Sequence, residues 1–316
     1  MNAPIAKPRG KSLVWRILHF PPMTLIVAIG VMLGASVVAT SLAAVVGARS
    51  DSHWAIVGGS LVAAVFMIAY IGFGRLVEHR RMTDLALKGA LVELLIGLAI
   101  GTVLFCAVVG VIALLGGYRV VGTQPADVLY PIIGLSIVSG VTEEIMLRGL
   151  FFRIIEGWLG SWVALVLSAA LFGALHLGNP NATLVAGGAI AIEAGVMLAA
   201  IYMVTRRLWA AIGLHAAWNF TQGGIFGIPV SGTDVQGVLV PRISGPILLT
   251  GGDFGAEASL PAMLICTAFG IALLVIASRR GQVIKPYWAR GAADGVGVGA
   301  DADAGDALSA GAGAQS

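Results

Sequence analysis

The sequence predicts an all-α membrane protein, a polytopic bundle of about eight transmembrane helices. Of its 316 residues, 58% are hydrophobic and only 11% are charged, and the mean hydropathy is +0.94. A soluble domain carries roughly 25% charged residues. The apolar residues also form long unbroken runs instead of alternating with polar ones, which favours helices over a β-barrel. Together these observations exclude a soluble fold.

Eight apolar runs account for the predicted helices. Most of them approach or exceed the roughly 20 residues that a helix needs to cross the hydrocarbon core. The seventh run is the weakest, because it is short and carries polar side chains. In chain order the runs are 23–47, 54–74, 90–115, 128–141 (continuing into a Glu-Glu segment), 162–176, 184–205, 208–226 and 260–278.

The basic residues indicate how the helices are oriented. With the N-terminus placed in the cytoplasm, sixteen of the nineteen Lys and Arg residues fall in cytoplasmic segments, including Arg148 and Arg153. Such an excess marks the cytoplasmic side of a membrane protein. We therefore expect a multi-pass protein of the bacterial inner (cytoplasmic) membrane with both termini cytoplasmic. The net charge of +3 gives no indication of nucleic-acid binding.

Three regions follow from the composition. Residues 1–20 form a basic cytoplasmic segment, and residues 21–290 hold the transmembrane bundle. Residues 291–316 are rich in Gly, Ala and Asp. With so few bulky apolar side chains, they cannot offset their ordering entropy by burial, so we expect a disordered cytoplasmic tail. The loop 228–259 is the only long extracytoplasmic segment, and a solvated loop is favoured over a re-entrant or capping element.

The sequence Ser139-Gly-Val-Thr-Glu-Glu-Ile-Met-Leu-Arg148 places three ionisable groups at the end of an apolar run. An unpaired charge in hydrocarbon costs about 2.5 kcal/mol or more, so ionisable groups at this position indicate a functional or pairing role. Glu144 and Arg148 are four residues apart and can pair on one helix face. Glu143 lies about 100° further around the helix and is left free to act as a base. The alternative is a plain ion pair at the membrane boundary.

Two further motifs carry polar groups within apolar runs. Phe172 and His176 are four residues apart, as are His215 and Asn219. A neutral imidazole can accept or donate a proton near neutral pH, and an amide donor suits a developing oxyanion. With Glu143 as base, this set fits attack by water on an amide carbonyl. The chain contains no Gly-x-Ser-x-Gly motif.

A metal site is an alternative use of the same residues. Glu143, His176 and His215 could together hold zinc and leave a position open for water. Neither His-x-x-x-His nor His-Glu-x-x-His occurs in the chain. We favour a reaction that requires no cofactor, and the zinc alternative stays open.

The three motifs, in this order within a multi-span chain, resemble the CAAX prenyl protease and bacteriocin-processing (CPBP, or ABI) family of intramembrane proteases. The resemblance covers about residues 128–226. It implies an eight-helix core, a cavity open to membrane and cytoplasm, and endopeptidase activity on a membrane-anchored peptide or protein, as in the eukaryotic members that cut after a prenylated cysteine. Family members are named metalloproteases, and a glutamate-dependent mechanism is also held for them.

The resemblance also assigns roles to the residues. Glu143 activates water and His176 assists. His215 and Asn219 stabilise the oxyanion. The supporting residues are Glu144, Arg148 and Phe172.

Two other classes of protein are compatible with the sequence. One is a non-catalytic membrane scaffold or bacteriocin-immunity protein with the same fold. The other is a secondary transporter, suggested by further carboxylates in apolar runs. Glu93 lies near the start of its run and can reach the interface. Glu193 lies mid-run and should face the bundle interior, where a proton relay is an alternative role. No clear internal repeat supports the transporter.

Overall fold

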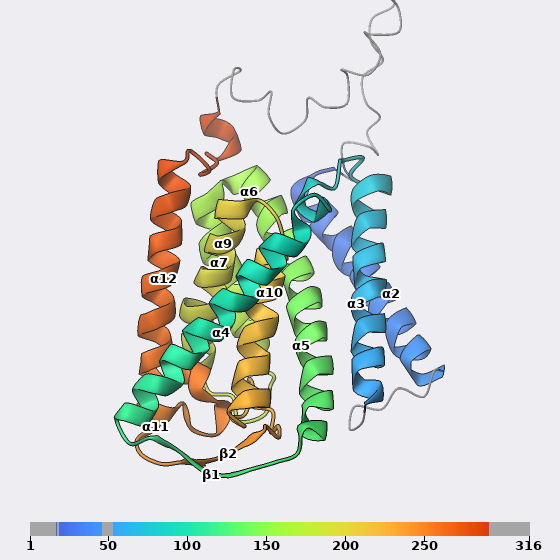
Figure 1. Cartoon of the computed structure of the whole chain (residues 1–316). Helices are drawn as coiled ribbons and strands as arrows, with labels where there is room; N and C mark the ends of the chain where they lie inside the picture. The colour runs from blue at the N-terminus through green and yellow to red at the C-terminus, as the bar shows by residue number, and fades with distance from the viewer. Residues whose placement is uncertain (1–16, 18, 46–52, 291–316) are drawn as a thin grey trace, which may run out of the picture.

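A computed structural model describes residues 17, 19–45 and 53–290. The predictions for the basic N-terminal segment therefore lie largely outside the described residues, and that for the tail 291–316 lies entirely outside them. The described chain is an all-α bundle, as predicted (Figure 1). Its long single helices are α2 (Pro21–Val45), α3 (Trp54–Leu76), α4 (Ala90–Leu114) and α12 (Leu260–Arg279).

Six helices of the described chain are long and apolar enough to cross a membrane. Besides the four above, they are the continuous helical stretches 126–159 and 184–205. The other two predicted spans are helical but short. Helix α7 (Ser161–His176) has 16 residues, and α10 (Trp209–Asn219) continues into the π-helical turn η5 (Phe220–Ile225). A polytopic membrane bundle is thus confirmed, whereas the count of eight spans is not.

The two continuous stretches are each interrupted by a π-helical turn. The first contains η2 (Ala126–Val128), α5 (Leu129–Glu144), the π turn η3 (Ile145–Phe152) and α6 (Arg153–Leu159). The second contains α8 (Leu184–Ile190), the π turn η4 (Ala191–Gly195) and α9 (Val196–Thr205). Short 3₁₀ turns lie outside them, at η1 (Thr83–Leu85) and η8 (Tyr287–Ala289).

Arg148 lies within a continuous helix and not in a segment between helices. The predicted run 128–141, which continues into the Glu-Glu segment, extends as one helical stretch to Leu159, and the side chain of Arg148 is fully buried inside the bundle. The carboxylate of Glu144 makes that burial tolerable, because it balances the charge. Arg153 also lies on this helix, where it pairs with Glu78 at 2.7 Å.

Helix α10 occupies the centre of the bundle. It packs against α4, α5 and α9, while α12 packs against α9 and α4. Figure 1 shows α4 crossing α10 obliquely, and α2 and α3 side by side along one edge, next to α5. The residues of α10 are accordingly almost all buried. Polar side chains on this helix must therefore find partners on the surrounding helices.

The loop 228–259 is packed against the bundle, so the prediction of a solvated loop was wrong. Its strand β2 (Leu239–Ile243) pairs antiparallel with β1 (Tyr118–Thr123), with Tyr118 opposite Ile243. It continues through α11 (Ile247–Thr250) and the 3₁₀ turns η6 (Gly252–Phe254) and η7 (Ala256–Ala258). Ile228, Val230, Phe254 and Glu257 are all buried. The ladder and these side chains make the loop a cap at the end of the bundle opposite α6 (Figure 1).

Candidate active site

Glu144 and Arg148 form the predicted ion pair. Arg148 Nη1 lies 2.9 Å from Glu144 Oε1, and both side chains are fully buried. Arg148 Nη2 also donates to the carbonyls of Ala194 (3.3 Å) and Gly195 (3.2 Å) at the η4 turn. Its guanidinium carbon lies 4.9 Å from the centre of the Phe172 ring on α7. This one side chain therefore joins three helical segments around the site.

His215 lies beside both glutamates of α5. Its Nδ1 is 2.9 Å from Glu144 Oε1. Because the carboxylate accepts, Nδ1 carries the proton, and Nε2 is the nitrogen that faces Glu143. His215 Nε2 and Glu143 Oε2 are 3.8 Å apart. Helix α5 can approach α10 this closely because residue 140 is glycine: a Cβ there would lie 2.9 Å from the Cβ of Ala216.

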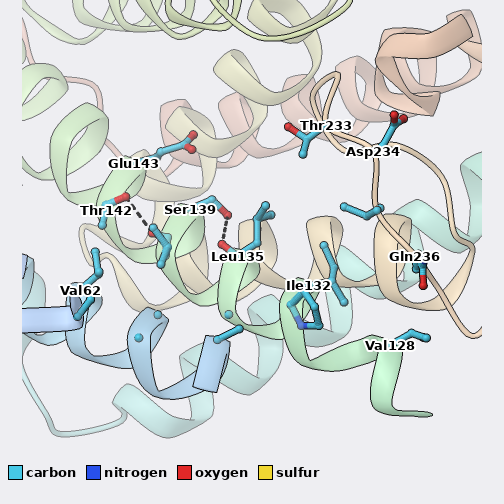
Figure 2. Close-up of a pocket in the computed structure, with 18 of the residues that line it drawn as sticks. Val62, Val128, Ile132, Leu135, Ser139, Thr142, Glu143, Thr233, Asp234 and Gln236 are labelled. Carbon is cyan, nitrogen blue, oxygen red and sulfur yellow. Dashed lines mark hydrogen bonds between the residues drawn. The ribbon is translucent and has the colours of Figure 1, made fainter. Parts of the chain in front are cut away.

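Glu143 opens on a large cavity of about 1130 Å³. The cavity lies between α3, α5 and the loop residues 233–236, and Figure 2 shows Glu143 at one end of the α5 wall that continues through Ser139 and Leu135. The Glu143 side chain is 33% exposed, whereas that of Glu144 is fully buried. One glutamate is thus tied to an arginine and a histidine, and the other faces open space.

The large cavity lies in the half of the bundle that carries β1 and β2. Its lining includes Ala43 at the end of α2, Ala55 at the start of α3 and Asp127 before α5, all near that end of the bundle. The described chain ends are at the opposite end (Figure 1).

His176, His215 and Asn219 line a second, much smaller cavity of about 20 Å³. His176 Nδ1 lies 2.7 Å from the carbonyl oxygen of Phe172, so this nitrogen donates. The Phe172 ring lies 4.6 Å from the His176 ring and 6.0 Å from the His215 ring, centre to centre. The predicted residues are therefore divided between two cavities: Glu143 lines the large one, and His215 reaches from the small one to Glu143.

Ser139 is a site residue that the sequence did not indicate. Asn219 Nδ2 donates to Ser139 Oγ at 2.8 Å, which links α10 to the wall of the large cavity. This contact comes from a different helix, so spacing along the chain does not reveal it. A usable signal was present, because Ser139 precedes Glu143 by four residues and so shares its helix face.

The other acidic residues have distinct surroundings. Glu93 pairs with Arg207 at 2.9 Å and is 25% exposed, which fits its expected place near the interface. Glu193 is buried in the interior, as predicted. Glu257 belongs to the cap and is also buried; its carboxylate accepts from the backbone N–H of Ser231. Burial raises the pKa of Glu257 from 4.5 to about 7.

Each π-helical turn of the site lies next to a polar residue of interest. Turn η3 follows Glu144, η4 contains Glu193, and η5 follows Asn219. A π turn inserts an extra residue and changes which side chains face a neighbouring helix, and such turns are frequent at functional sites. The pattern of apolar residues in the sequence does not predict these π turns.

The side chains as placed do not fit the zinc alternative. A zinc site needs three or four ligands about 2.0–2.3 Å from the metal. Across the described ranges, no three His, Cys, Asp or Glu side chains lie close enough together to hold a metal ion. Glu143, His176 and His215 therefore do not form a three-ligand set as placed.

Fold and site together define a polytopic helical membrane protein with a carboxylate–histidine cluster inside its bundle. Residues 125–221 match the family described as Type II CAAX prenyl endopeptidase, Rce1-like. The match contains all three motifs and confirms the resemblance to the CPBP intramembrane proteases. It indicates protease activity of the CAAX type, and it gives no support to the metalloprotease or ABI label. Curated proteins and solved structures give no match to the chain.

Proposed function

We propose that this protein is an intramembrane endopeptidase that hydrolyses a peptide bond in a membrane-anchored, CAAX-like substrate by means of water activated by Glu143. One observation carries the proposal. Glu143 has a partly exposed carboxylate on a large cavity, while its neighbour Glu144 is held in a buried ion pair. A carboxylate that retains access to water inside an apolar wall can act as a general base.

The reaction begins with a water molecule held between Glu143 and His215. At 3.8 Å, the Glu143 Oε2 and His215 Nε2 atoms are close enough for one water to contact both. Glu143 takes a proton as the water oxygen attacks the substrate carbonyl. It then returns this proton to the amine, and the carbon–nitrogen bond breaks. Glu143 ends the cycle in the state in which it began. The proposed reaction uses no cofactor.

His215 and Asn219 are the donors to the oxyanion. When both ring nitrogens of His215 carry protons, Nδ1 donates to Glu144 and Nε2–H is available to the developing charge. The amide of Asn219, which donates to Ser139, gives a second donor at the cavity wall. His176 assists from the adjoining small cavity, next to the Phe172 ring that also contacts His215.

The large cavity suits an extended, largely apolar segment. From Val128 to Glu143 the α5 wall has a length of about 22 Å, from a rise of about 1.5 Å per residue. That length accommodates about seven residues of an extended peptide at roughly 3.3 Å each. The lining is mostly apolar, and its charged side chains are Glu143, Asp127 and Asp234. We place the protein in the bacterial inner membrane with its termini cytoplasmic, on the strength of the basic residues.

Peptide cleavage in lipid nanodiscs tests the proposal. The purified protein is incubated with a library of membrane-anchored peptides, with and without a lipid on cysteine, and products are read by mass spectrometry. Glu143→Gln should lower the rate by about 100-fold or more, since it removes a general base. The matched control is Glu93→Gln, which makes the same change in an apolar helix away from the site and should retain the rate.

Three outcomes would contradict parts of the proposal. Cleavage that survives Glu143→Gln would overturn the role of that carboxylate. Activity lost on dialysis against a chelator and restored by zinc would overturn the cofactor-free reaction. If the library is not cleaved and a cellular phenotype is retained in Glu143→Ala and His176→Ala, the protein is a non-catalytic scaffold.

A further inference from the structure

The small cavity beside the two histidines has room for one water molecule. Its volume is about 20 Å³, and a single water needs at least about 10–15 Å³. The helices α7, α10 and the η4 turn contribute to its lining, and the cap contributes Ser231 and Glu257. A water in such a cavity is stable when it finds two to four polar partners.

Glu193 supplies one such partner. It is 1% exposed, and among the described residues its Oε2 atom has no hydrogen-bond partner. The thiol of Cys266 on α12 hydrogen-bonds to the same carboxyl group. Buried polar atoms in folded proteins are nearly always paired with protein or ordered water. Glu193 lines a cavity of the right size for that water.

His176 supplies the second partner. Its Nδ1 donates to the Phe172 carbonyl, so in the neutral imidazole Nε2 is the nitrogen that can accept a hydrogen bond. Glu257 approaches from the cap and is held there by the Ser231 N–H. The titratable groups around the cavity are thus His176, His215, Glu193 and Glu257, with Cys266 behind Glu193, and no Lys or Arg belongs to the lining.

We infer that one buried water in this cavity joins the carboxyl group of Glu193 to His176, and that Glu193 is a positioning residue for the hydrolysis. This inference rests on the proposed function. The water fixes the orientation of the imidazole, as an outer hydrogen-bond partner does for a metal-ligating histidine. Through Glu257 the cap closes the cavity, so the segment 228–259 is part of the active site and not only a lid on the bundle.

Two substitutions at position 193 separate positioning from a structural role. Glu193→Gln keeps a polar group that can hold the water, and should retain kcat within about threefold. Glu193→Met has a similar shape without a polar atom for water, and should lower kcat on the order of tenfold while KM changes little. A purely structural role predicts that the two variants fall together, in parallel with their thermal stability. Equal losses in both variants, or no loss in Glu193→Met, would overturn the inference.

A structure that shows ordered water provides a test independent of cleavage. The wild-type protein should have one water in the cavity, within hydrogen-bond distance of Glu193 and His176, and Glu193→Met should have none. A dry cavity in the wild type would overturn the inference even if cleavage depends on Glu143. If cleavage does not depend on Glu143, the proposed function fails, and the water is still read directly from the structure. The same measurement serves if Glu193→Met does not fold.

Discussion

Replacing Arg148 with methionine should destabilise the protein strongly, because Arg148 is the cation that balances a buried carboxylate. Its side chain is fully buried, pairs with Glu144 at 2.9 Å, and donates to two carbonyls of η4. Breaking a buried pair by removing one partner costs about 3–5 kcal/mol, since the other charge is left uncompensated. At about 2–4 °C per kcal/mol for a chain of this size class, the melting temperature should fall by roughly 6–20 °C.

A double-mutant cycle identifies the cause of that loss. If the uncompensated charge of Glu144 is responsible, Glu144→Gln in the Arg148→Met background should recover part of the stability. Thermal unfolding of the four proteins in one detergent, followed by intrinsic tryptophan fluorescence, gives the coupling energy. Arg148→Lys is a further variant, and it should also be destabilised because lysine cannot reproduce the guanidinium fork. An Arg148→Met protein within about 1 kcal/mol of wild type would refute the reasoning.

Two further predictions concern the helix contact at the site and the cap. Gly140→Ala should lower the free energy of unfolding by about 1–3 kcal/mol and reduce cleavage, because the new Cβ would lie 2.9 Å from the Cβ of Ala216 and push α5 away from α10. The control is Gly72→Ala, where a Cβ meets no atom within 4 Å. Equal melting temperatures for the two variants would contradict the prediction. The pKa of Glu257 in the folded protein is about 7, above the usual 4.5. Its contribution to the free energy of unfolding should therefore be complete below about pH 4.5. That contribution should be lost as the pH rises through 7, by up to about 3 kcal/mol. Unfolding between pH 5 and 9 should show this loss in the wild type, and a Glu257→Gln protein with the same pH dependence would exclude Glu257 as its source.

The residue pattern was sufficient for the class of fold and for the ion pair within the Glu-Glu motif. Apolar runs in a chain so poor in charge can be stable only as helices in a bilayer, and the structure has helices over all eight of them. The spacing of Glu144 and Arg148 predicted their ion pair for a local reason. Residues four apart share a helix face whatever surrounds them.

Contacts between distant segments were beyond the reach of the sequence. The loop 228–259 is Gly- and Pro-rich in sequence, yet it is packed, because β2 pairs with β1 more than a hundred residues away. The spacing predicted the pair of Arg148 with Glu144, but the full burial of Arg148 depends on the η4 carbonyls and the Phe172 ring, which come from other helices. The contact of Asn219 with Ser139 likewise depends on how α10 lies against α5.

The sequence by itself determined that this protein is a helical membrane bundle, that it carries three polar motifs of the CAAX protease type, and that Glu144 pairs with Arg148. These are consequences of hydropathy and helix periodicity, which act over one or two turns. Only the tertiary structure decided that Glu143 opens on a large cavity while the histidines and Asn219 line a small one, with Glu193 and Glu257 beside them. Helix packing and π turns set that arrangement, because they determine which face of each helix meets its neighbours.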